Sequence, residues 1–267
     1  MRIAFIGGGN MGEAMIRCLV DKGVAKAADI VASDVIEARR SYLKKQYGIA
    51  TTSINRSAAD KADVIIMAVK PNAIPATLAD LKGRTRADQT VISIAAGITL
   101  SKLCQGLDRK AIVRAMPNTP AQIGEGMTVW TVSGDATEQD QERARTILGA
   151  MGKQIFVADE KFIDMATAVS GSGPGYVFLI IESFVDAAVR IGLPRDMAQE
   201  LVMETISGSV SLAQKSGKHP AELRNMVTSP GGTTAEGLHA LEEGRLRALL
   251  ARAIIAGYER AKALRSE

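Results

Sequence analysis

A glycine-rich loop between an apolar strand and an amphipathic helix constrains the fold of this chain more than any other feature. Residues Arg2–Ile6 predict a buried strand, and the loop Gly7–Gly12 that follows matches the pattern G-x-G-x-x-G. Gly7 permits a tight turn, Gly9 lets a pyrophosphate approach the backbone, and Gly12 lets the helix pack on the strand. The free N–H groups at the start of that helix favour phosphate. The loop therefore predicts a dinucleotide-binding βαβ unit at the N-terminus.

Asp34 follows the second expected strand, Ile30–Ser33, and lies about 20 residues after Gly12, the spacing expected of a carboxylate that binds the adenosine ribose. Facing a 2′-phosphate at about 4 Å, this carboxylate would cost on the order of 4 kcal/mol at an effective dielectric near 20. Four neighbours offset that cost if Asp34 turns outward: Ser33, Asn55, Arg39 and Arg40. The residues alone slightly favour NADH.

Apolar runs alternate with amphipathic segments over the first half of the chain, which is typical of a parallel sheet covered by helices. Further strands are expected at Val64–Val69, Thr90–Ile94, Ala111–Ala115, Met127–Thr131 and Lys153–Val157, the last closing the sheet. Helices are expected between them at Met11–Lys22, Ile36–Tyr47, Leu100–Gln105 and Glu138–Met151.

Beyond about residue 160 only helical periodicity is found. Long helices are expected at Tyr176–Ile191, Asp196–Lys215 and Arg245–Leu264. The charges of the first of these lie on one narrow face, so we expect it to be buried by its own domain or by another subunit. The fold class is therefore α/β: a Rossmann-type dinucleotide-binding domain over 1–159, then an all-α substrate-binding and dimerisation domain over 160–267.

Charge and rare residues exclude several classes of function. The net charge is +4, but Lys and Arg are mixed with Asp and Glu, and a nucleic-acid reader would need a basic stripe with aromatic platforms. Two cysteines and two histidines form neither a disulfide framework nor a zinc spacing, so we expect reduced thiols and no metal. With no targeting segment before the first strand and no uncharged apolar run of about 18 residues, we expect a cytoplasmic protein without membrane association.

The remaining cofactor contacts are expected where other strands end, because nucleotides bind outside the carboxyl edge of such a sheet. Ala68–Pro71 and Ile94–Gly97 end two strands with small residues, although Lys70 is equally compatible with a solvated surface lysine. The residues expected to bind the cofactor are Ile6, Gly7, Gly8, Gly9, Asn10, Met11, Gly12, Asp34, Asn55, Ala68, Val69, Lys70, Pro71, Ala95 and Ala96.

Three further motifs stand out: Met116–Pro120 (MPNTP), Ser170–Tyr176 (SGSGPGY) and Val227–Thr234 (VTSPGGTT). The last two are each expected to open a helix, where free N–H groups and hydroxyls form a nest suited to a carboxylate. For one such segment, simple helix capping is the better explanation. Two of them behind a nucleotide site favour a substrate pocket.

These motifs, with FIGGGNM at 5–11 and AVKP at 68–71, appear in an order that resembles the pyrroline-5-carboxylate reductase family. The resemblance spans nearly the whole chain and implies hydride transfer from NADPH or NADH to a cyclic C=N bond, giving L-proline, the last step of proline biosynthesis. It also implies homodimers intertwined through the helical domain, sometimes assembled into decamers. Many members of this family have Ser or another neutral residue where Asp34 stands, so Asp34 argues against the family's usual preference for NADPH. Both cofactors are therefore expected, with NADPH first by a narrow margin. Gly175 stands where Ala is usual.

The resemblance assigns the substrate site to the third motif. Thr234 is implied as the catalytic hydrogen-bond donor to the imine nitrogen, consistent with a reaction that needs a proton there and no nucleophile or metal. The residues implied to bind the substrate are Ser229, Gly231, Gly232, Thr233 and Thr234.

Two alternatives remain at this point. A reductase of the β-hydroxyacid dehydrogenase kind commonly needs a Lys on the first long helix of its second domain, and Tyr176–Ile191 contains none. A non-catalytic sensor of the nicotinamide nucleotide would not need the Ser229–Thr234 segment.

Overall fold

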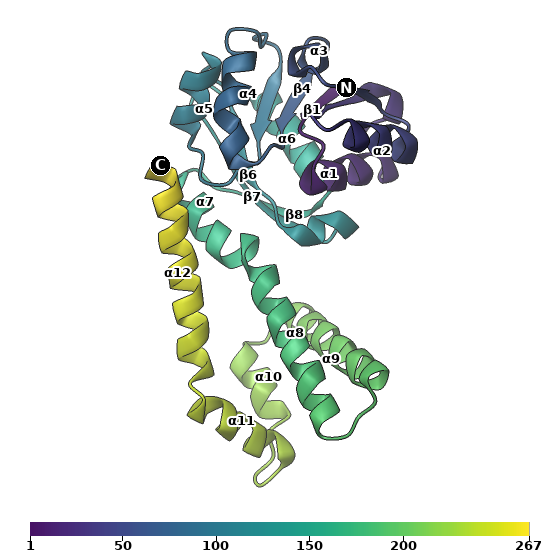
Figure 1. The fold of residues 1–267 in the computed structure, drawn as a ribbon. Coiled ribbons are helices and arrows are strands. Elements are labelled where there is room, and N and C mark those ends of the chain that lie inside the picture. Colours follow the sequence, from purple (N-terminus) through teal and green to yellow (C-terminus); the bar gives the residue numbers. More distant parts are fainter. Residues whose placement is uncertain (267) are drawn as a thin grey trace. The chain divides into compact units, whose positions relative to one another are not determined.

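The structure is a computed structural model that describes residues 1–266, and the chain packs as two compact units. One comprises Met1–Pro174 together with the stretch that begins at Ala256, and the other is Gly175–Ile255 (Figure 1). The first unit extends beyond residue 159 because the helix α7 (Lys161–Ala166) packs on the sheet. A division into domains 1–159 and 160–267 stays a prediction.

One eight-stranded sheet forms the first unit, in the order β3-β2-β1-β4-β5-β6-β7-β8 (Figure 1). The strands are β1 (Ile3–Ile6), β2 (Ile30–Ser33), β3 (Ala50–Thr52), β4 (Val64–Met67), β5 (Thr90–Ser93), β6 (Val113–Met116), β7 (Gly126–Val132) and β8 (Gly152–Phe156). Strands β1 to β6 are parallel. The Rossmann-type class is confirmed, and β8 closes the sheet as expected.

Two features of the sheet were not predicted. The strand β3 is only three residues long, too short to show a period. The strand β7 runs antiparallel to β6, because the turn between them contains only a short 3₁₀ helix, η3 (Thr119–Ile123). Parallel neighbours need a longer crossover connection.

Alternate residues of each strand supply two cores on opposite faces of the sheet. From β1, Ile3 and Phe5 pack with helices α1, α2 and α6, while Ala4 and Ile6 pack with α3, α4 and α5. These helices are α1 (Asn10–Asp21), α2 (Glu37–Tyr47), α3 (Asn55–Ala59), α4 (Ile74–Leu81), α5 (Leu100–Leu107) and α6 (Glu138–Gly149). The helices α3 and α4 were not predicted from the sequence, because α3 is short and α4 has a proline in its first turn.

The second unit contains only helices among its described elements. They are most of α8 (Gly173–Arg190), then α9 (Arg195–Ser216), α10 (Pro220–Met226), α11 (Thr233–Glu243) and the start of α12 (Leu246–Ser266). Its core is small, centred on Val185, Ala198 and Val202. Large apolar side chains of α8 are exposed instead, among them Phe178 and Leu179, which are 61% and 62% exposed. Within one chain, α8 is therefore not buried on most sides, which leaves a second subunit to cover it.

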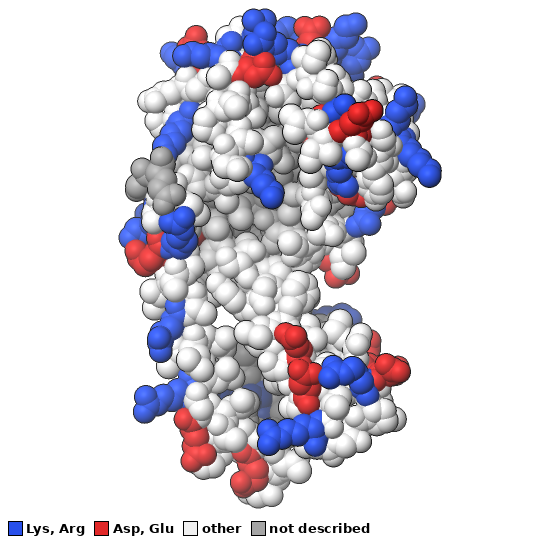
Figure 2. Space-filling model, in the orientation of Figure 1, with Lys and Arg blue, Asp and Glu red and all other residues white. Residues whose placement is uncertain are grey.

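Length and composition alone would let one helical stretch, Lys161–Arg190, cross a membrane. A helix that a second subunit covers meets the same criteria. On the face drawn in Figure 2, the blue Lys and Arg residues are interspersed with the red Asp and Glu residues rather than joined into one stripe.

Candidate functional site

The glycine loop joins β1 to α1 at the carboxyl edge of the sheet, where β1 lies between β2 and β4. Gly7 has φ +100°, and a Cβ there would lie 2.8 Å from Val69 Cγ1. A Cβ on Gly12 would lie 2.6 Å from the Gly7 carbonyl oxygen. Both positions therefore need glycine for the loop to close on Ala68–Val69.

Gly9 differs from its neighbours because a Cβ there would meet nothing within 4 Å. Gly9 is the N-cap of α1 and has no side-chain cap, and the first bond of the helix runs from Glu13 N to Gly9 O (2.8 Å). The amides of Asn10, Met11 and Gly12 precede that bond. Open space beside these amides fits the pyrophosphate of a dinucleotide.

Asp34 turns toward the glycine loop. One carboxylate oxygen accepts a hydrogen bond from Gly8 N and the other from Ile36 N, each at 2.9 Å. Next to it, the buried Ser33 hydroxyl donates to Asn55 Oδ1 (2.8 Å). The carboxylate keeps lone pairs for a ribose hydroxyl, and its negative charge stays at the loop.

The two arginines expected to offset this charge both have partners already. Arg39 donates to the Gly8 carbonyl and pairs with Glu13. Arg40 Nη1 donates to the carbonyls of Asp34 (2.8 Å) and Val35 (3.1 Å). A 2′-phosphate would therefore compete with existing bonds for either guanidinium.

Glu13, which the sequence analysis did not single out, ties α1 to α2. Tyr42 and Tyr47 donate to one of its oxygens at 3.0 and 2.7 Å, and Arg39 pairs with the other. Burial raises the pKa of the Glu13 carboxyl, but the bonds from Arg39 and the two tyrosines outweigh it and hold this pKa below its ordinary 4.5. Burial and the bond to Glu13 raise the pKa of Tyr47.

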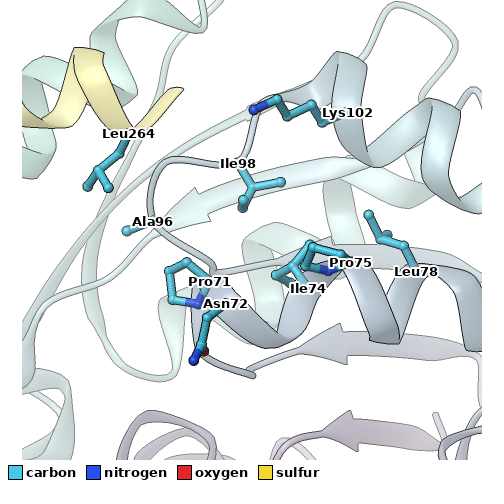
Figure 3. Close-up of a pocket in the computed structure, with 9 residues that line it drawn as sticks. All are labelled: Pro71, Asn72, Ile74, Pro75, Leu78, Ala96, Ile98, Lys102 and Leu264. Carbon is cyan, nitrogen blue, oxygen red and sulfur yellow. The ribbon is translucent and has the colours of Figure 1, made fainter. Parts of the chain in front are cut away.

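The expected nicotinamide side of the cleft lies where β4 and β5 end. Pro71 and Ala96 border one groove, with Ile98 beside them and Lys102 at its rim (Figure 3). Ala95 is buried, whereas Lys70 is exposed. The structure thus brings the Ala68–Pro71 and Ala95–Ala96 segments to the same edge as the glycine loop, and it leaves Lys70 in solvent.

The segment Ser170–Tyr176 does not form the expected nest. It lies inside a continuous helical run, where Thr167–Gly171 forms a π-helical turn, η4. Ser172 N donates to Thr167 O (2.8 Å) and Ser170 Oγ to Ala166 O (2.9 Å), so these groups bond within the helix. The segment does open a helix, because α8 begins at Gly173. The free nest was wrongly expected, because η4 lies directly before α8 and takes the bonds of Ser170 and Ser172.

The MPNTP motif has a structural role in the first unit. Asn118 Oδ1 accepts a hydrogen bond from Met127 N (2.8 Å), which holds the turn between β6 and β7. A Cβ on Gly171 would lie 2.9 Å from Met116 Cε, so η4 packs closely on the end of β6.

The segment Val227–Thr234 does open a helix, and it is described within the second unit alone. Gly232 is the N-cap of α11 without a side-chain cap, and the first helical bond runs from Glu236 N to Gly232 O. The amides of Thr233, Thr234 and Ala235 therefore lie before the first helical hydrogen bond and have no acceptor within the helix. Gly231 has φ +69°, and a Cβ on Gly232 would lie 2.5 Å from Ser229 Oγ. This anion nest, Ser229–Thr234, can accept a carboxylate and offers hydroxyls beside it.

Sequence reasoning also missed a partly buried ion cluster in the first unit, formed by Arg114, Glu160, Asp164 and Arg265. An arginine inside the apolar run Ala111–Met116 was the signal that could have found it.

Comparison with known proteins covers the whole chain. Residues 160–264 match the family described as pyrroline-5-carboxylate reductase dimerisation, and residues 2–97 match the family described as NADP oxidoreductase coenzyme F420-dependent. The chain is 38% identical to the pyrroline-5-carboxylate reductase of Arabidopsis thaliana, over 98% of this chain and 95% of that one. It is also 38% identical to that of Escherichia coli K12, over 98% of each.

Two solved structures are similar over nearly their full length. The pyrroline-5-carboxylate reductase of Coxiella burnetii superposes with a TM-score of 0.90, at 36% identity and 98% coverage of both chains. The pyrroline carboxylate reductase of Plasmodium falciparum, solved with NADP bound, superposes with a TM-score of 0.92, at 32% identity over 99% of this chain and 98% of that one.

Proposed function

The chain belongs to the pyrroline-5-carboxylate reductase family, and we propose that it reduces 1-pyrroline-5-carboxylate to L-proline with hydride from a nicotinamide nucleotide. It is accordingly an oxidoreductase of proline, and hence amino-acid, biosynthesis. The observation that carries this assignment is 38% identity over 98% of the chain to reductases of this name. The open phosphate loop at Gly9 and the anion nest on α11 are the two binding elements that the reaction needs.

Each element has a distinct task in the proposed reaction. When bound, the reduced nicotinamide supplies a hydride to the carbon of the C=N bond. Gly232 N already donates to Ser229 O (3.1 Å), so the free amides of Thr233 and Thr234 hold the substrate carboxylate, with the turn Ser229–Gly232 beside them. The Thr234 hydroxyl donates a hydrogen bond to the ring nitrogen. The ring nitrogen, which is basic enough to take a proton from water, gains the proton that the amine product needs, and the Thr234 donor stabilises this nitrogen as its charge changes in the transition state.

Both cofactors are used in our proposal, with NADPH ahead of NADH by a narrow margin. The NADP-bound relative and the NADP oxidoreductase family favour NADPH. Asp34 at the glycine loop and the engagement of Arg39 by Glu13 favour a substantial share for NADH. The remaining cofactor-binding assignments are the loop residues Ile6–Gly12, together with Asn55, Ala68–Pro71, Ala95 and Ala96.

The matched dimerisation family and the exposed apolar face of α8 support a homodimer. We also propose that the dimers assemble further into a decamer and that the protein is cytoplasmic.

A steady-state assay with pyrroline-5-carboxylate, run with NADH and NADPH side by side, tests the proposed activity. The expected product is L-proline with either cofactor. Tight cofactor binding without turnover would favour the sensor, and turnover of a 3-hydroxyacid in place of the imine would favour the β-hydroxyacid dehydrogenase class.

A further inference from the structure

Arg114 is a charged side chain in the middle of a buried strand. It lies on β6 beside Ser93 of β5, and it is 1% exposed. Its guanidinium pairs with Glu160 (2.7 Å) and Asp164 (2.9 Å). Arg265 from the end of α12 pairs with the same two carboxylates, at 3.6 and 3.3 Å. The hub, as we call these four residues, thus contains two positive and two negative charges.

Such a cluster is poorly explained by stability alone. Buried ion pairs add little net stability compared with apolar packing, while the loss of one partner is costly. The cost of an unpaired charge makes the pairing of Arg114 with Asp164 and Glu160 strict, because their side chains are 1%, 4% and 17% exposed; Arg265, at 40%, joins this group from the surface. The segments that the hub connects therefore indicate its role.

Glu160 and Leu264, the neighbour of Arg265, contact the segment Ala95–Leu100 at two points. Glu160 Oε1 accepts a hydrogen bond from Leu100 N (2.6 Å), at the first residue of α5, three residues after Gly97. Leu264, the neighbour of Arg265, covers the loop itself, because a Cβ on Gly97 would lie 2.8 Å from Leu264 Cβ. Figure 3 shows Leu264 reaching from the C-terminal helix toward Ala96 and Ile98.

Asp164 and Arg114 hold a second pair of segments. Asp164 lies on α7, which continues directly into η4, and Gly171 of η4 packs on Met116. Met116 lies two residues after Arg114 on the same strand. The hub thus connects the ends of β5 and β6 with the SGSGP segment and the C-terminal end of the chain.

We propose that Arg114, Glu160, Asp164 and Arg265 are positioning residues that hold the Ala95–Gly97 loop in its cofactor-binding conformation. The end of α12 acts as a strap on that loop. This inference rests on the proposed function only in that Ala95 and Ala96 bind the nicotinamide side of the cofactor. None of the four side chains contacts the reacting atoms in this scheme.

Arg265→Met tests the strap, because Arg265 is 40% exposed at its side chain and its loss leaves Arg114 paired. We expect the Kd for NADPH and for NADH, measured by fluorescence titration, to rise together by about tenfold, since small misplacements of a binding group weaken it by such factors. Amide exchange of residues 95–100, followed by mass spectrometry, should accelerate. Arg265→Lys keeps the charge and should bind both cofactors nearly as the wild type does.

Arg252→Met is the matched control, since it removes an exposed arginine from the same helix. It should change neither the Kd nor the exchange of residues 95–100. Leu264→Ala keeps Cβ but removes the rest of the side chain that lines the groove beside Ala96 and Ile98. It touches no charge and should reproduce Arg265→Met in milder form. It also keeps the test decisive if Arg265→Met fails to fold.

A lower Tm in Arg265→Met and Leu264→Ala, with unchanged Kd and unchanged exchange of residues 95–100, would overturn the proposal and leave the hub a purely structural feature. The outcome is separable from the proposed function. A wild type that binds the cofactor but does not reduce pyrroline-5-carboxylate defeats the function and leaves both readouts of the hub intact.

Discussion

Thr234 is the second residue of α11, in the turn whose amides precede the helical hydrogen-bond ladder. Its hydroxyl is the donor that we assign to the imine nitrogen. Thr234→Ala should lower kcat by roughly 10²–10³, the usual effect of losing one positioned donor. The Kd for the cofactor should stay unchanged, because the glycine loop is intact. Steady-state kinetics and a fluorescence titration measure the two effects.

Thr234→Ser is the control for that substitution. It keeps a hydroxyl at the same position and should retain most of kcat. A Thr234→Ala enzyme with activity close to wild type would remove Thr234 from the mechanism.

We expect Asp34 to influence the cofactor preference through its charge at the glycine loop. Asp34→Ser should raise the NADPH/NADH ratio of kcat/KM by about 1–3 kcal/mol of discrimination, because the repulsion of the 2′-phosphate is removed. NADH should lose a ribose hydrogen bond worth about 1 kcal/mol. Both cofactors should also bind a less ordered loop, since the bond from Gly8 N is lost.

Glu37→Ser serves as the control for Asp34, because Glu37 is an exposed carboxylate three residues away at the start of α2. Its substitution should leave the cofactor ratio unchanged. An unchanged ratio in Asp34→Ser as well would show that the carboxylate does not face the ribose.

At the scale of elements, two glycines at the start of α1 are expected to have different roles. Gly12 is needed for the fold, and Gly9 is needed for cofactor binding. A Cβ on Gly9 meets nothing, so Gly9→Ala should keep the wild-type Tm and raise the cofactor Kd by about tenfold or more, because the methyl group fills the pyrophosphate space. Gly12→Ala puts a Cβ 2.6 Å from Gly7 O and should lower the Tm as well. Thermal melts and titrations of both variants check this, and equal Tm losses would contradict it.

The link between α1 and α2 through Glu13 should depend on pH. Its folded-state pKa lies below the ordinary 4.5, so the stability that it contributes is present above pH 4.5 and is lost as the pH falls through the lowered value. Glu13→Gln should therefore lower the free energy of unfolding by about 1–2 kcal/mol at neutral pH. Urea titrations should show this difference shrinking in acid, and a difference that grows in acid would contradict the sign.

At the scale of the whole molecule, the second unit exposes many large apolar side chains around a small core. Phe178 is 61% exposed on α8, within the residues that match the dimerisation family. Sedimentation at micromolar concentration should give at least twice the 28.3 kDa of one chain without detergent. Phe178→Glu should shift the protein toward monomer, because a charge cannot be buried unpaired at an apolar interface.

Glu182→Gln is the control, since Glu182 lies on the polar face of the same helix and should leave the oligomer intact. A stable wild-type monomer would contradict the dimer, and a protein that needs detergent to stay in solution would point to the membrane alternative for Lys161–Arg190.

Local patterns were enough to predict the Rossmann unit, because strand period, glycine spacing and helix starts are properties of neighbouring residues. The first two strands, the helices α1 and α2, the Gly7–Gly12 loop and the long helices α8, α9 and α12 follow from such patterns. The opening of α11 at Thr233 does too. The sequence by itself also determined the family, since its motifs occur in order along the chain.

Tertiary structure decided what depends on contacts between distant residues. The direction of β7, the pairing of Arg39 with Glu13 and the turn of Asp34 toward Gly8 involve partners that no local pattern relates. The same is true of the hub, whose members are as much as 151 residues apart, from Arg114 to Arg265. Burial makes these interactions strong, and burial is set only when the chain has folded.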